Sequence, residues 1–137
     1  MGANPCAVDP DREIERFSRK LDAGAEFAIT QPVFDAEALF GFLDKIGKFP
    51  KQIPIIAGVW PLTSFRNAEF MNNEVPGVVV PDSILERLKK CTDKEEGARV
   101  GAEIAHEIME TISPRVNGFQ VSAPFGRVDL ALAALGK

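Results

Sequence analysis

Residue types that carry much of enzyme chemistry are scarce in this sequence. Its 137 residues include no tyrosine, one histidine and two cysteines. Cys6 and Cys91 show neither a CxxC pair nor another metal-ligand spacing, so we expect reduced thiols and neither a disulfide nor a metal site. The lone histidine, His106, lies in a polar stretch of a predicted helix, where we expect it to be solvated. No Ser-His-Asp or Cys-His arrangement is apparent, which argues against nucleophilic catalysis by such a group.

Long apolar runs, basic blocks and glycine-rich phosphate loops are also missing. No segment approaches the ~20 apolar residues of a membrane span, and the N-terminal residues lack the apolar core of a secretory signal. The net charge is −4 and lysine and arginine do not cluster, so a nucleic-acid partner is not expected. The composition favours a cytoplasmic protein with one globular domain over residues 1–137.

Strand and helix patterns alternate along the chain. A helix is predicted from Pro10, with Asp9 as its N-cap and Gly24 at its end. Three apolar runs, each followed by a proline-bearing turn and a helix, are predicted to be strands, and they cover residues 27–31, 53–60 and 118–123. The run 53–60 is apolar on both alternating faces, as in a parallel strand covered on both sides.

The remaining segments are predicted to be helical, apart from a proline-broken connector over 75–81. Asp35 caps the helix after the first strand, Thr63 or Ser64 caps the helix after the second, and another helix starts at 82 or 83. A long helix spans about 93–113, and small residues recur in it every four positions, at Gly97, Gly101 and Ala105. That spacing predicts close packing of this helix against a neighbour.

This alternation predicts an α/β fold with a parallel sheet, which we interpret as the C-terminal three strand-helix units of a (β/α)8 TIM barrel. A complete barrel needs about 250 residues, so the sheet is expected to be incomplete by itself. The helix at Asp9 precedes the first visible strand, so an earlier strand is expected to be missing, with Asn4 and Pro5 just after it. We therefore expect the remainder of the barrel, or another copy of the chain, as a partner.

In such barrels the active site lies where the strands end. The turns and helix starts after the three strands carry polar and aromatic candidates: Gln31, Asn67, Phe125 and Arg127. An amide such as that of Gln31 reads the edge of a heterocycle, or else caps nearby backbone. The Arg127 guanidinium suits a carboxylate or phosphate, or else starts a surface helix. Asn67 can reach the rim, or else is an exposed helical side chain, and no carboxylate sits at a strand end to serve as a general acid or base.

Long segments around these turns resemble one family. The matching runs, in order, are AEFAITQPVFD (25–35), IAGVWPLTS (56–64), RNAEFMNNEVPGV (66–78) and VSAPFGR (121–127). They are similar to methylenetetrahydrofolate reductases, and the WPLTS and NNEVPG runs are closest to the branch fused to a homocysteine S-methyltransferase domain. The resemblance covers essentially the whole chain.

The resemblance implies a flavin-dependent oxidoreductase that passes a hydride from a nicotinamide nucleotide through FAD to 5,10-methylenetetrahydrofolate, giving 5-methyltetrahydrofolate for methionine biosynthesis. It implies that Gln31 contacts the pterin and Arg127 the distal part of the folate, and that Phe125 lines the same slot. Asn67 stands where other branches carry glutamine. Phe70 or Met71 falls where an aromatic side chain packs on the benzoyl ring.

On the cofactor side, the resemblance implies flavin contacts from Asn4, Lys20 and Glu13. The carboxylate acid of the family and most of its flavin contacts lie on earlier strands, so no catalytic residue is expected in this chain. The leading hypothesis is a folate-facing segment of the reductase that is inactive alone. The alternative is a non-catalytic folate-binding or assembly fragment without flavin. An unrelated barrel aldolase is disfavoured because no strand-end lysine or carboxylate is present.

Overall fold

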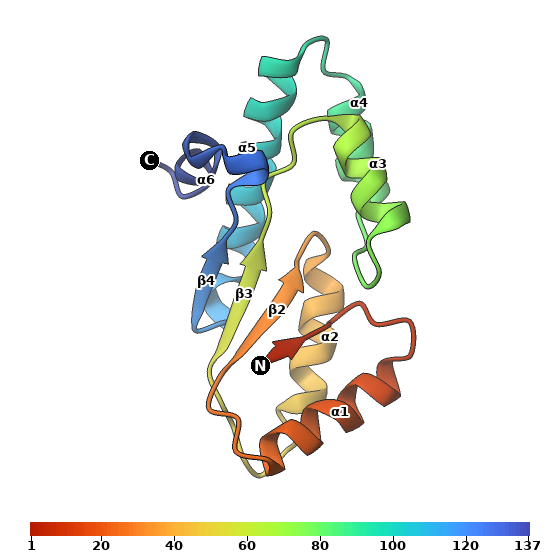
Figure 1. Cartoon of the computed structure of the whole chain (residues 1–137), viewed down its shortest axis with the longest axis vertical. Helices are drawn as coiled ribbons and strands as arrows, with labels where there is room; N and C mark the ends of the chain where they lie inside the picture. The colour runs from red at the N-terminus through yellow and green to blue at the C-terminus, as the bar shows by residue number, and fades with distance from the viewer.

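The computed structural model describes residues 1–137 and forms a parallel four-stranded sheet with helices packed on it (Figure 1). The strands lie in the order β1-β2-β3-β4 and every neighbouring pair is parallel. Along the chain the elements are β1 (Gly2–Ala3), α1 (Pro10–Asp22), β2 (Ala28–Pro32), α2 (Ala36–Ile46), β3 (Ile55–Val59), α3 (Phe65–Glu74), α4 (Asp82–Lys89), α5 (Lys94–Ile112), the 3-10 helix η1 (Ser113–Arg115), β4 (Gly118–Val121), the 3-10 helix η2 (Pro124–Gly126) and α6 (Val128–Ala134).

The three predicted strand-helix units are present, and the sheet has one strand more than expected. β1 pairs with β2 through Gly2 opposite Ile29 and Ala3 opposite Thr30. The earlier strand that we expected to be missing is therefore present, at least in part, as β1. Asn4 directly follows it, as expected. A two-residue strand escapes sequence patterning because alternation needs several residues to show.

Side-chain caps begin the main helices as the sequence predicts. Asp9 accepts a hydrogen bond from the Arg12 amide at 3.1 Å, and Asp35 accepts one from the Ala38 amide at 3.2 Å. Between the two alternatives for α3, Ser64 is the cap. These caps start α2 and α3 shortly after a strand ends, which keeps the turns that frame the site short.

Helices cover only one face of the sheet. The main core joins the sheet to α1, α2 and α5 through Phe17, Leu39, Ala57 and Ile112, and Figure 1 shows α2 and α5 behind the strands. The opposite face carries Ile29 and Ile56, which stay partly exposed, so the predicted cover on both sides of the sheet is wrong for this chain. In a closed barrel that second face packs against interior side chains of other strands, which explains its apolar character.

A second core lies under α3, α4 and α5, around Leu62 and Leu88. Here the small residues of α5 allow the close packing that their spacing predicts. A Cβ on Gly97 would come within 2.7 Å of the Thr63 carbonyl oxygen, and one on Gly101 would overlap that of Leu62. The helix thus lies directly against the turn after β3 and holds it in place. None of the helices combines the length and apolar character needed to cross a membrane.

Candidate functional site

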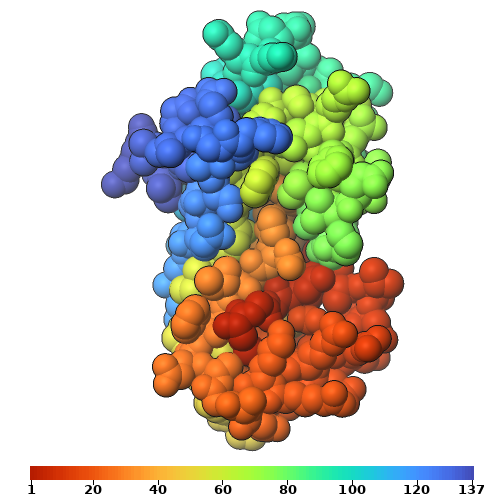
Figure 2. All heavy atoms as spheres, in the orientation of Figure 1, coloured from red at the N-terminus to blue at the C-terminus, as the bar shows by residue number.

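The end of β2, the turn after β3, α3 and the turn after β4 frame a hollow of about 750 Å³, which we call the main hollow. Figure 2 shows it as a groove between the green α3 segment and the blue C-terminal segment. Its volume falls in the range of small-molecule sites. The lining residues are Gln31, Pro32, Trp60, Thr63, Ser64, Arg66, Asn67, Phe70, Met71, Val75 and Phe125. None of them is a carboxylate, so the hollow can bind and orient a ligand but offers no carboxylic acid for proton transfer.

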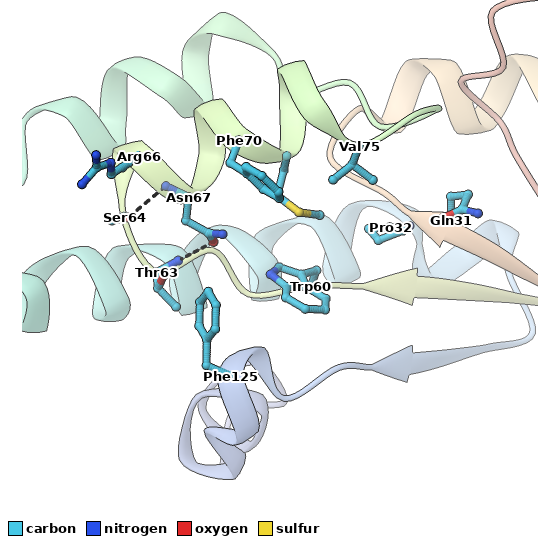
Figure 3. A pocket seen from close by; sticks show the side chains of 11 residues that line it. Gln31, Pro32, Trp60, Thr63, Ser64, Arg66, Asn67, Phe70, Val75 and Phe125 are labelled. Carbon is cyan, nitrogen blue, oxygen red and sulfur yellow. Dashed lines mark hydrogen bonds between the residues drawn. The ribbon is translucent and has the colours of Figure 1, made fainter.

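Gln31 lies at one end of the main hollow (Figure 3). It is near the end of β2, and its exposed side chain makes no hydrogen bond to the rest of the chain. The alternative interpretation, an amide that caps backbone, is therefore wrong. A free amide carries two donors and an acceptor, which suits a heterocycle whose edge presents both kinds of group.

A buried side chain holds the strand end at Gln31. Thr30, only 5% exposed, accepts a hydrogen bond on Oγ1 from the Gly58 amide at 3.0 Å and donates one to the Gln31 carbonyl at 2.8 Å. The pairing of β2 with β3 is irregular here, between Ile29 and Pro32. The Thr30 hydroxyl thus accepts from the Gly58 amide where a regular ladder would use a backbone carbonyl. Its second hydrogen bond, to the Gln31 carbonyl, positions Gln31.

Asn67 lies midway along the main hollow on α3. Its backbone amide donates to Ser64 Oγ at 3.0 Å, and its Oδ1 accepts from the Thr63 amide at 3.3 Å. The side chain is half-buried, so it is not an exposed helical residue. Because the oxygen is engaged, the NH2 group is the part left free for a ligand.

Phe70 and Met71 both line the main hollow, but in different ways. Met71 is 6% exposed and belongs to the core beneath α3, whereas Phe70 is 57% exposed. Figure 3 shows the Phe70 ring along the hollow, between Asn67 and Val75. Of the two candidates for packing on an aromatic ligand, the structure favours Phe70, with Met71 as apolar support.

Phe125 faces the main hollow from the opposite wall (Figure 3). It is 78% exposed, and its backbone φ of 53° makes it the only non-glycine residue with positive φ. A bulky residue in this region costs on the order of 1 kcal/mol, and burial offsets little of that cost here. The strained backbone thus holds an exposed aromatic ring against the main hollow.

Trp60 forms part of the wall of the main hollow. Its indole nitrogen is the one buried side-chain polar atom without a hydrogen-bond partner. Trp60 is also the only tryptophan of the chain, so a ligand in the main hollow would lie against the single indole, whose fluorescence we expect it to quench.

Arg127 does not line the main hollow. Its guanidinium is exposed and donates two hydrogen bonds to Asp129, at 2.9 and 2.6 Å. This contact raises the pKa of Arg127 and lowers that of Asp129. Arg127 lies instead on an adjoining cavity of about 340 Å³, which we call the side hollow and which is lined by Thr63, Ser64, Lys94, Ala98, Phe125 and Arg127.

The three predicted flavin contacts fall into two places. Glu13 is buried and accepts a hydrogen bond from the Asn4 amide at 2.9 Å, and both residues line a cavity of only about 150 Å³. Lys20 lies apart on α1 and donates to the Gly2 carbonyl at 2.9 Å. Each of the three already has a partner in the chain, and the cavity is smaller than typical ligand sites. This chain alone therefore does not form a site that fits FAD.

Sequence reasoning missed one charged member of the main hollow, Arg66. It lies on the first turn of α3, beside Ser64 and at the end of the hollow opposite Gln31 (Figure 3). The signal that could have found it is its position two residues after the N-cap of a helix that follows a strand end. A hollow with a free amide at one end and a guanidinium at the other suits an elongated ligand with an anionic end.

Comparisons with known proteins agree on one family. The family model described as methylenetetrahydrofolate reductase matches residues 2–122. The chain is 31% identical over 120 residues to methylenetetrahydrofolate reductase 2 of Schizosaccharomyces pombe, a match that covers 81% of this chain and 19% of that protein. It is 30% identical over 111 residues to 5,10-methylenetetrahydrofolate reductase of Escherichia coli, a match that covers 80% of this chain and 37% of that protein.

A solved structure is also similar. It is an uncharacterized protein from Clostridium thermocellum that binds two copies of 5-methyl-5,6,7,8-tetrahydrofolic acid. It superposes with a TM-score of 0.56 at 26% identity, over 91% of this chain and 49% of that one. The chain thus spans well under half the length of these curated relatives and about half of this neighbour. With its parallel strand-helix units and a model match over nearly its whole length, the chain belongs to the methylenetetrahydrofolate reductase family.

Proposed function

We propose that this chain is the folate-binding segment of a methylenetetrahydrofolate reductase, the enzyme that reduces 5,10-methylenetetrahydrofolate to 5-methyltetrahydrofolate with a nicotinamide donor. The observation that carries the proposal is the main hollow, where the free amide of Gln31 and the exposed ring of Phe70 lie along one groove. The family match and the folate ligand of the structural neighbour support it. The two free cysteines, Cys6 and Cys91, fit the reducing cytoplasm in which we place the protein.

The residues suggest how the ligand is oriented. Gln31 pairs with the donor–acceptor edge of the pterin, and Asn67 offers its NH2 group further along. Phe70 and Phe125, on opposite walls of the hollow, enclose the benzoyl ring. Bound FAD supplies the hydride chemistry in this family. The contribution of this chain is orientation, because a single fixed pose is a large part of what a hydride transfer needs from the protein.

We further propose that other strands complete the site. β1 and β4 are the edges of the sheet, each with one strand neighbour, and one face of the sheet lacks helices. The remainder of the barrel or a second copy of the chain would cover these surfaces, and other strands would supply the acid and most of the flavin site. A monomer that melts cooperatively, seen by ultracentrifugation and calorimetry, would contradict this part of the proposal.

Replacement of Gln31 by alanine tests the folate site. We expect the affinity for 5-methyltetrahydrofolate to fall about tenfold, because the pterin edge loses its paired amide. Quenching of Trp60 fluorescence during titration measures the affinity. Gln120→Ala is the matched control, since Gln120 is an exposed glutamine on β4 outside the main hollow. An unchanged affinity in Gln31→Ala would remove Gln31 from the site, and no binding by the wild-type chain would refute the proposed function.

A second candidate is a non-catalytic folate-binding or assembly fragment. The structural neighbour favours this candidate, because that protein binds two copies of 5-methyl-5,6,7,8-tetrahydrofolic acid. We expect the isolated chain to bind folate without oxidising a nicotinamide nucleotide, since the chain alone forms no site that fits FAD, the acceptor of the hydride in this family. Flavin absorbance and turnover of the complete polypeptide separate the candidates. A coloured, active protein supports the reductase, and a colourless protein that takes up no added flavin supports the fragment.

A further inference from the structure

The side hollow adjoins the main hollow and shares part of its wall. Thr63, Ser64 and Phe125 line both cavities. In Figure 3, Thr63 and Ser64 lie toward the end of the main hollow that carries Arg66, opposite Gln31. A ligand that is anchored at Gln31 and is long enough to pass Phe125 therefore reaches the side hollow.

The side hollow is cationic. Lys94, the first residue of α5, lines it together with Arg127. Arg127 is engaged by Asp129, but Lys94 is exposed and belongs to none of the ion pairs of the chain. Arg66, at the neighbouring end of the main hollow, is likewise outside these ion pairs. Two free cations thus flank the place where the two cavities join.

The chemistry of folates complements this arrangement. Their aromatic part ends in a glutamyl group, which carries carboxylates several bonds beyond the benzoyl ring. A lysine ammonium near such a carboxylate forms a charge-assisted hydrogen bond. No carboxylate side chain lines the side hollow to compete for Lys94.

We infer that the glutamyl tail of the ligand passes Phe125 into the side hollow and that Lys94 binds one of its carboxylates. The inference rests on the proposed folate site and adds to it a residue that distinguishes folates with a glutamyl tail from those without one. Lys94 acts on the tail alone, because it lines the side hollow and not the main hollow.

The test compares two ligands on the whole chain, 5-methyltetrahydrofolate and 5-methyltetrahydropteroate, which lacks the glutamyl group. We expect Lys94→Gln to weaken binding of the first roughly fivefold and to leave binding of the second unchanged. Trp60 quenching measures both affinities. Lys94→Arg, which keeps the charge, should restore the affinity to within about twofold, and high salt should weaken the wild type more than Lys94→Gln.

Lys48→Gln provides the matched control, because Lys48 is an exposed lysine after α2, outside both hollows. Equal weakening of both ligands by Lys94→Gln, or no weakening of either, would overturn the inference while leaving the folate site intact. Quenching by neither ligand in the wild-type chain would overturn the proposed function and the inference together.

Discussion

Gly101→Ala should be among the most damaging single changes in this protein, with a loss of about 3 kcal/mol in the free energy of unfolding. Gly101 is buried in α5, and a Cβ there would overlap the carbonyl oxygen of Leu62. Leu62 is 1% exposed and packs in the second core, so the turn cannot shift without opening that core. The added methyl group would meet backbone atoms of Leu62. Backbone atoms cannot move aside as the end of a flexible side chain can.

Urea unfolding of wild type and variant measures the effect. If the free energy of unfolding depends on urea concentration with the same slope in both proteins, a shifted midpoint reports a change in stability. The matched control is Gly41→Ala, the same substitution in α2, where a Cβ meets nothing within 4 Å. There the better helix propensity of alanine should stabilise the chain by about 0.5–1 kcal/mol. We expect opposite signs for the two variants, and a neutral Gly101→Ala would contradict the close approach of α5 to the turn after β3.

Thr30→Val should weaken both the fold and the folate site. Valine keeps the shape of threonine but leaves the Gly58 amide, in a buried position, without the acceptor that it has at 3.0 Å. An unsatisfied buried amide costs about 2 kcal/mol. The bond to the Gln31 carbonyl is lost as well, which frees the strand end, so we expect affinity for 5-methyltetrahydrofolate to fall about fivefold.

Thr30→Ser separates the role of the hydroxyl from that of the methyl group. It keeps both hydrogen bonds and loses one buried methyl, worth about 0.8 kcal/mol, so its ligand affinity should stay near that of the wild type. Hydrogen exchange at the Gly58 amide gives a local measurement, with faster exchange expected in Thr30→Val and protection retained in Thr30→Ser. Equal protection in the two variants would show that the hydroxyl does not hold β3 to β2.

Gly58 also contributes to the contact between β2 and β3 at Thr30. A Cβ there would lie 2.5 Å from the Thr30 carbonyl oxygen, so the strands approach this closely because residue 58 has no side chain. A glycine inside an apolar run indicates a bulge or a close backbone approach. The partner in that approach depends on the register between β2 and β3, which the glycine alone does not reveal.

Much of the candidate site was predictable because it follows strand ends. Gln31, Asn67, Phe70, Met71 and Phe125, all named from the sequence, line one hollow in the structure. Periodicity and caps placed them on turns and helix starts, and the motif resemblance suggested their roles. That these residues bind folate stays a prediction, which the fluorescence titrations address.

Arg127 and Lys94 show where sequence reasoning stopped. That Arg127 contacts the distal part of the folate stays a prediction: Asp129, two residues further along, engages its guanidinium, and Arg127 lines the side hollow but not the main hollow. Lys94 was not predicted, because it begins a helix far along the chain from the strand-end turns. Only the packing of α5 against the turn after β3 brings Lys94 to the side hollow, beside Thr63 and Phe125.

The three strand-helix units, the caps Asp9 and Asp35 and the family of the chain followed from the sequence, because they depend on local periodicity, local hydrogen bonding and matching motifs. Tertiary structure alone decided that helices cover one face of the sheet, that Thr30 joins β2 to β3 and that Phe125 takes a positive φ against the hollow. These features depend on strand register and on contacts between distant segments, which compete with the local preferences of each residue. For that reason the strand ends could be predicted from the sequence, whereas the main hollow and the side hollow could not.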